Sequence, residues 1–186
     1  MRSLFFSLHR IFGTLISLLF LMWFISGLVL IYHPFPNVSK EQKYEKMDTL
    51  PSSLPDIKDL LTRIPEVEGI RSVKVKQFQD QTLFSVKTKD STYTLCPDSL
   101  EEVLPITQQS IDLIAKKWVN APVLKIDTLY DNEQWIMYSR YNDELPIYKY
   151  YFDDAAKHEL YISSRTGEVQ QFTSQSERMW AWFGAI

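Results

Sequence analysis

An uncharged stretch near the N-terminus constrains this chain more than any other feature of its sequence. Residues 11–32 read IFGTLISLLFLMWFISGLVLIY and contain no Asp, Glu, Lys or Arg. At about 1.5 Å per residue, a helix over this stretch would reach roughly 33 Å, enough to cross a hydrocarbon core of about 30 Å. The sequence therefore predicts one transmembrane helix over residues 11–32, preceded by a short tail over residues 1–10.

A cleaved signal peptide is the competing interpretation of this stretch. Signal peptides have apolar cores of about 7–15 residues, followed by small residues at the cleavage site. The apolar stretch here is longer, and the segment LIYHPFP that follows its core offers no pair of small residues. The sequence thus favours a helix that stays attached to the rest of the protein.

The charges beside this helix bear on its orientation. Arg2 and Arg10 precede it, and Lys40, Lys43 and Lys46 follow it, so a count alone does not favour a cytoplasmic N-terminus. Three features favour it nevertheless: an arginine adjoins the apolar stretch, the tail has no acidic residue, and long domains translocate largely regardless of their charge. We expect the tail in the cytoplasm and the domain outside it.

Composition excludes several functions for the remainder of the chain. Acidic residues outnumber basic ones, 23 to 20, which argues against a nucleic-acid partner. The sequence has no Gly-rich phosphate loop, CxxC, HExxH or GxSxG motif, so it offers no catalytic residues. Any chemistry would have to come from a bound cofactor.

Two histidines lie at the ends of the apolar stretch. His9 and His33 are 24 residues apart, about 36 Å on a continuous helix, so they cannot bind one metal ion or one haem. Each belongs either to a separate site near its own membrane face or to the interface without a ligand. His9 also shares a helical face with Gly13 and Ser17, a spacing that lets another helix or a flat cofactor approach closely, unless the stripe is incidental.

The first half of the domain has a helix and then strands. Residues 33–53 have no apolar periodicity and predict a linker. Ser53 and Asp56 resemble a capping box before a helix whose buried stripe would be Ile57, Leu60, Leu61 and Ile64. Alternating or β-rich segments then predict strands over 70–78, 82–89 and 91–95.

The same order of elements then recurs. A second helix has its stripe at Ile111, Ile114, Ala115 and Trp118, and further strands are expected over 123–130, 134–140, 146–152, 158–163 and 168–172. We expect an α+β domain in which helices pack on antiparallel sheet, built from two helix-plus-strands repeats over residues 54–105 and 106–173.

The second repeat is acidic and rich in tyrosine. Between Asp127 and Glu159 there are eight acidic residues against three basic ones, but no segment has the ligand spacing of a calcium loop. A solvated face is the simpler interpretation, and a contact surface for a basic partner, a peptide or a flat ligand is the alternative.

The last segment, residues 174–186, is aromatic. In RMWAWFGAI, Trp180, Trp182 and Phe183 suit the headgroup zone of a membrane, with Arg178 on the water side. This pattern predicts the approach to a second membrane helix that would lie beyond Ile186. The alternative is an element that simply packs on the domain.

Three of these segments together resemble the PepSY-associated transmembrane family. They are LHRIFGTLISLLFLMWFISGLVLIYHPFP, YISSRTGEV and RMWAWFGAI, in this order. The resemblance implies PepSY-like repeats in the periplasm, an inner-membrane location and a role in iron uptake, since some members look like haem-carrying reductases of ferric siderophores. It makes His9 and His33 candidate axial ligands of a haem b, each completed by a histidine of another membrane helix.

The chain departs from that family because no further helices follow the tryptophan-rich run. The resemblance therefore implies the N-terminal part, or one subunit, of a haem-dependent electron-transfer system for iron or siderophore reduction, without reductase activity of its own. Its partners would be the membrane, other transmembrane helices or a partner subunit, and a ferric siderophore. The alternative is a membrane-tethered PepSY module that binds a peptidase and has no redox activity.

Overall fold

The computed structural model describes residues 2–54, 56–62, 64, 69–78, 81–89, 92–96 and 106–184. These residues form two compact units. Residues 1–38 and 119–186 make up the first unit, and residues 39–118 make up the second. Both combine helices with antiparallel strands, which confirms the α+β class.

The first unit begins with the long helix α1 (Arg2–Tyr32), which is continuous over 31 residues, or roughly 46 Å. It ends immediately before His33, as the proline at position 34 leads one to expect, and the last backbone bond runs from His33 N to Val29 O at 2.7 Å. Residues Ser3–Tyr32 are the one helix in the described ranges that is long and apolar enough to cross a membrane, a test of length and composition that a signal sequence also passes. The expected tail is therefore helical from its second residue.

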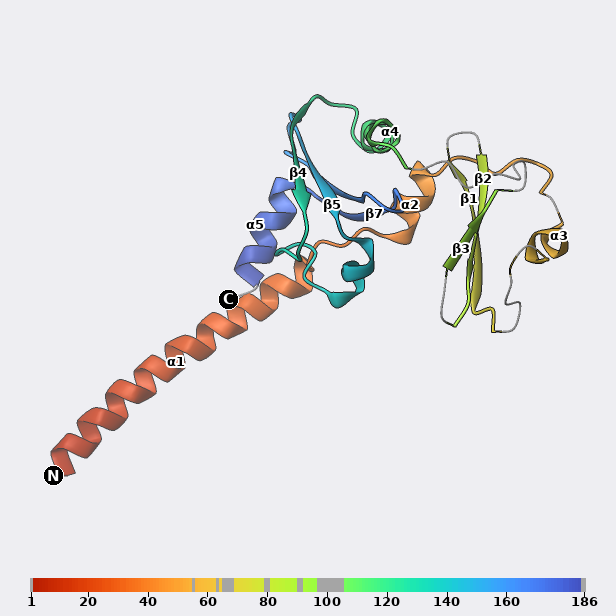
Figure 1. Cartoon of the computed structure of the whole chain (residues 1–186). Coiled ribbons are helices and arrows are strands. Elements are labelled where there is room, and N and C mark those ends of the chain that lie inside the picture. Colours follow the sequence, from red (N-terminus) through yellow and green to blue (C-terminus); the bar gives the residue numbers. More distant parts are fainter. Residues whose placement is uncertain are drawn as a thin grey trace. The chain divides into compact units, whose positions relative to one another are not determined.

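The sheet of this unit is an antiparallel meander in the order β4-β5-β6-β7. Figure 1 labels β4, β5 and β7. Its strands are β4 (Val123–Leu129), β5 (Ile147–Phe152), β6 (Glu159–Ser163) and β7 (Val169–Thr173), all at positions where strands were expected. The register pairs Lys149 with Tyr161 and Tyr151 with Glu159, so these four side chains share one face of the sheet.

The prediction of a strand over residues 134–140 is wrong. This segment is a turn that leads into the short 3₁₀ helix η1 (Ser139–Glu144). Trp135 and Ile136 are adjacent in sequence and both buried, in one core cluster with Ile147 and Tyr161. A strand would send neighbouring side chains to opposite faces, so burial of both apolar side chains in one core favours a turn here.

The last described helix of the first unit is α5 (Gln175–Gly184), and a capping box marks its N-terminus. Ser174 N donates to Glu177 Oε2 at 2.7 Å, and Glu177 N donates to Ser174 Oγ at 3.3 Å, the reciprocal bonds of a capping box. Ala181 on this helix joins the core cluster of the sheet. One face of α5 therefore packs on the domain.

The second unit holds a three-stranded antiparallel meander. Its strands are β1 (Ser72–Phe78), β2 (Gln81–Lys87) and β3 (Thr92–Leu95), as the alternation predicted. Its helices are α2 (Lys40–Lys46), α3 (Ile57–Leu61) and α4 (Gln108–Trp118). In α4 the expected stripe is confirmed at Ile111 and Ala115, which are each 1% exposed.

Two helix starts differ from expectation. Helix α2 lies within the expected linker and is capped by Ser39, whose Oγ accepts from Gln42 N at 3.1 Å. Helix α3 is capped by Asp56, whose Oδ1 accepts from Lys58 N at 2.9 Å, so the capping box expected between Ser53 and Asp56 is wrong.

The PepSY-like repeats are not confirmed by this architecture. The boundary between the compact units falls between α4 and β4, after residue 118, whereas the repeats were expected to meet at residue 105. The expected boundary between the repeats falls within residues 97–105, which lie outside the described ranges. The repeats therefore stay a prediction.

Candidate functional site

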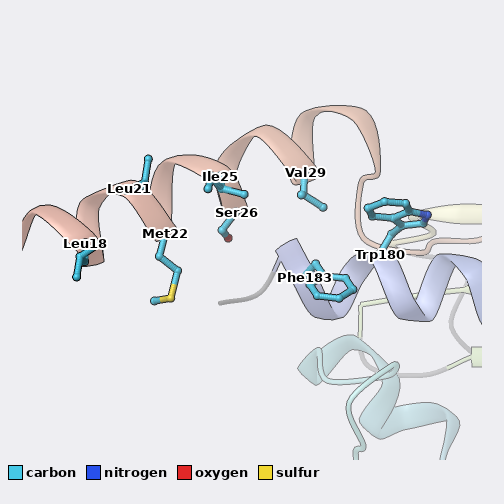
Figure 2. A pocket seen from close by; sticks show the side chains of 8 residues that line it. All are labelled: Leu18, Leu21, Met22, Ile25, Ser26, Val29, Trp180 and Phe183. Carbon is cyan, nitrogen blue, oxygen red and sulfur yellow. The ribbon is translucent and has the colours of Figure 1, made fainter.

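Helix α5 lies beside the C-terminal turns of α1 and runs antiparallel to it. Trp180, in the middle of α5, stacks on His33, just past the end of α1, whereas Gly184 at the end of α5 lies against Ser26 and Leu30. Later residues of α5 therefore contact earlier residues of α1. Figure 2 shows the two helices meeting in this way.

The closest contact between the two helices depends on small residues. Ser26 Oγ donates to Gly184 O at 2.8 Å, and Ser26 is only 8% exposed. A Cβ atom added to Gly184 would lie 2.5 Å from Leu30 Cδ2 and 2.8 Å from its Cγ, so a larger residue requires Leu30 to move. Small residues, and hydroxyl side chains that hydrogen-bond across to the other helix, are typical of helix contacts inside membranes.

His33 is held by stacking on Trp180. The two ring centroids are 4.4 Å apart and the ring planes differ by 7°. Stacking covers a ring face, whereas the nitrogen atoms of imidazole bind metals in the ring plane. Within the described residues no hydrogen bond is recorded to either ring nitrogen of His33, and its side chain is exposed. The ring is thus oriented and can still act as a ligand.

His9 lies on the exposed surface of α1, 24 residues before His33. Because α1 is continuous, the two side chains are about 36 Å apart along the helix axis, and the structure does not bring them together. A bis-histidine haem needs two imidazoles on one iron. The residues of one chain therefore do not complete such a site; His9 and His33 can each offer one ligand to a separate haem.

The third histidine has a structural partner. His158 Nδ1 lies 2.6 Å from Asp154 Oδ2, and the imidazole ring stacks on Phe172 with centroids 4.7 Å apart. Burial alone would raise the pKa of Asp154, but hydrogen bonds from the backbone and ring of His158 outweigh it and lower that pKa. This pair stabilises the turn between β5 and β6.

An apolar groove of about 530 Å³ runs along α1 beside the end of α5 (Figure 2). Its α1 side is a stripe of large side chains at helical spacing, and two aromatic rings of α5 close one end. The lining residues are Leu18, Leu21, Met22, Ile25, Ser26, Val29, Trp180 and Phe183. Its lining suits an apolar occupant.

The sheet fixes the direction of α5 through Arg178. Its guanidinium lies 3.3 Å from Glu159 Oε1 and donates to Lys157 O at 2.7 Å and to Thr173 Oγ1 at 2.8 Å. In addition, Gln175 N donates to Ala156 O at 2.9 Å. The sheet and the β5–β6 turn thus hold the first turns of α5 and direct its last turn towards α1.

A second cation, Lys149, shares the carboxylate of Glu159 with Arg178. Lys149 Nζ is 2.8 Å from Glu133 Oε1 and 3.2 Å from Glu159 Oε2, and its side chain is 9% exposed. Burial would lower the pKa of Lys149, but the two carboxylates outweigh it and raise that pKa. Tyr161 OH lies 2.6 Å from the Glu133 oxygen, and burial together with the carboxylates raises the pKa of its phenol.

These pairings account for much of the acidity of residues 127–159. Glu133 and Glu159 balance Lys149 and Arg178. Three aspartates have a neighbouring partner as well: Asp127 pairs with Lys125, Asp153 with Lys157 and Asp154 with His158. Among the described residues no group of three or more His, Cys, Asp or Glu side chains is placed to hold a metal ion.

No protein-family model, curated protein or solved structure matches this chain. The resemblance to the PepSY-associated transmembrane family therefore depends on the three sequence segments alone. What the chain does has to be argued from its geometry.

Sequence reasoning missed the residues that join α5 to α1. Ser26 is a polar residue inside an apolar span, a signal for contact with another helix. Ser174 and Glu177 have the spacing of a capping box just before the aromatic run, which marks a helix start at that point. The stacking of Trp180 on His33 has no sequence signal, because it depends on how α5 packs.

Proposed function

We propose that this chain is a membrane-anchored component of a haem-dependent electron-transfer system for iron or siderophore reduction. It would lie in a bacterial inner membrane, with the N-terminus in the cytoplasm and PepSY-like domains in the periplasm. The observation that carries the proposal is the antiparallel packing of α5 on α1, with His33 oriented where they meet. Such a pair of helices is suited to assemble with further membrane helices.

The same packing argues that α1 stays attached. Gly184 O is bonded to Ser26, and Trp180 packs on His33, so the folded domain uses the end of α1 as part of its own structure. Cleavage near residue 33 would remove Ser26 and Leu30 and leave this side of α5 uncovered.

A haem would supply one-electron transfer across the membrane. The contributions of this chain are to offer an imidazole near each membrane face and to hold the ring plane of His33 against Trp180. One chain provides no second ligand for either haem, so we expect partner helices to supply it and expect no reductase activity from the isolated chain.

Haem content tests this proposal. The complex purified gently from native membranes should show the absorption bands of a b-type haem, and His33→Gln should remove most of that haem because it removes an axial ligand. His158→Gln is the matched control, since it changes an imidazole that also stacks on an aromatic ring but lies in a turn. The chain purified to homogeneity should show no haem band.

Three results would contradict the haem proposal. They are a haem-free complex, a complex whose haem is unchanged in His33→Gln, and a stoichiometric haem band from the isolated chain. The first two leave the anchoring of α1 intact, since anchoring does not depend on a cofactor.

A second function is favoured by the edge of the four-stranded sheet. Strand β4 is an edge strand, and Val123, Leu124 and Ile126 are 43%, 60% and 43% exposed. An exposed edge with apolar side chains can bind an extended peptide by adding it as a further strand. On this reading the chain is a membrane-tethered module that modulates a peptidase, and His33→Gln leaves its activity unchanged.

A further inference from the structure

The first unit carries a group of exposed apolar and aromatic side chains outside α1. They come from two segments that are far apart in the sequence, the connection between β4 and β5 and the outer face of α5. The six side chains are between 50% and 72% exposed: Tyr130, Met137, Tyr138, Met179, Trp182 and Phe183. Folding leaves each of them at least half exposed, so this surface needs an explanation outside the domain core.

The β4–β5 connection is fixed beside the point where α1 ends. Phe35 follows α1 by three residues, and its ring lies 5.6 Å from that of Trp135. Gln171, which is 1% exposed, donates through Nε2 to Pro36 O at 2.8 Å and to Trp135 O at 3.1 Å. One buried side chain thus ties the connection to the segment that leaves α1.

The C-terminal end of α5 also lies beside the last turns of α1. Ala181 packs in the core cluster that contains Trp135, whereas Gly184 lies beside Ser26, about 9 Å before the end of α1 at 1.5 Å per residue. Trp182 and Phe183, which are exposed, therefore lie level with the last turns of a helix apolar enough to span a membrane.

The chemistry of the six side chains suits the boundary between lipid and water. Tyrosine and tryptophan combine an apolar ring with one polar group and are enriched at headgroup level. None of the six is basic, and residues 130–146 hold four acidic residues against one basic residue, Arg140, so attraction to anionic lipids does not explain the surface. Burial of apolar area in zwitterionic lipid explains this surface instead.

We infer that these two segments form a membrane-contact surface, and that the first unit lies with the β4–β5 connection and the end of α5 in the headgroup region of the bilayer. The first unit then lies on the membrane around the point where α1 ends, and no linker holds it away from the bilayer. This inference rests on the anchoring of α1 in the proposed function and is independent of haem and of electron transfer.

Spin labels measure immersion directly. Single cysteines replace Met137, Tyr138 or Trp182 in the full chain with Cys96→Ser, reconstituted into phosphatidylcholine nanodiscs. Collisions with oxygen, which concentrates in lipid, are compared with those of a water-soluble nickel chelate. Leu19→Cys on α1 is the lipid control. Asp153→Cys is the aqueous control, because Asp153 is exposed and lies in the β5–β6 turn, which contacts the other end of α5.

Labels at positions 137, 138 and 182 should show several-fold lower nickel accessibility than the label at 153, together with raised oxygen accessibility. If they match position 153 while position 19 is in lipid, the surface does not contact the membrane and the inference fails with the anchor intact. If they are shielded from both reagents, a protein covers the surface and the inference also fails. If position 19 is in water, the anchor itself fails, and the proposed function with it.

Discussion

Replacing Lys149 by Met is expected to lower the free energy of unfolding of the first unit by about 3–5 kcal/mol, the usual cost of removing one partner from a buried ion pair. The ammonium group is the cation that lies between Glu133 and Glu159, and its side chain is 9% exposed. Without it, two carboxylates remain close to the hydroxyl of Tyr161 with one positive partner fewer. Denaturant titration of the purified chain in detergent, followed by near-ultraviolet circular dichroism, measures the loss.

Lys125→Met is the matched control for this variant. Lys125 lies on the neighbouring strand and pairs with Asp127 at 2.7 Å, but its side chain is 65% exposed, so its loss should change stability far less than the loss of Lys149. Equal effects of the two substitutions would show that the buried network contributes no more than a surface pair.

The pH dependence adds a second signature to Lys149→Met. In the wild type the raised pKa of Lys149 means that its contribution is complete below the ordinary value of 10.5 and is lost only as the pH rises through the raised value. The methionine of the variant does not titrate. The deficit of the variant should therefore be constant around neutral pH and shrink only as the pH rises above 10.5.

Trp135→Ala should also destabilise the first unit strongly, by about 3–5 kcal/mol, because it opens a cavity in the core. Trp135 is 7% exposed and contacts both the core cluster and Phe35 beyond α1. The same denaturation experiment measures this loss. Tyr130→Ala, at a side chain 72% exposed, is the control and should leave stability in detergent within about 0.5 kcal/mol of the wild type. A small effect of Trp135→Ala would mean that residues 134–136 are not part of the core.

Most elements of the fold could be predicted because their patterns are local. The seven strands of the described residues have β-rich or alternating sequences, and α4 has its stripe at Ile111 and Ala115. Where prediction failed, the local pattern was ambiguous or absent. QWIMYSR is rich in strand-forming residues, yet burial of both Trp135 and Ile136 in one core requires a turn. Helix α2 (KEQKYEK) is mostly charged and has no apolar stripe, so its capping box was the available signal.

The candidate site was only partly predictable, for a different reason. The separation of His9 and His33 follows from helix geometry once α1 is continuous. The meeting of His33 with Trp180 joins opposite ends of the chain, and no local pattern encodes it. It depends on the bonds of Arg178 to the sheet, on the capping of α5 and on a glycine at position 184, which act only in the folded unit.

The central claim is that α1 remains attached in the membrane with α5 packed against its end. Cysteines in place of His33 and Trp180, with Cys96→Ser, test it by cross-linking in native membranes with a short thiol-specific reagent, followed by mass spectrometry. The pair His9→Cys and Trp180→Cys is the control. The account predicts a full-length chain that retains residues 1–32 and carries an internal cross-link between positions 33 and 180 but none between 9 and 180. A mature chain that begins near residue 33, or a full-length chain without the 33–180 cross-link, would contradict it.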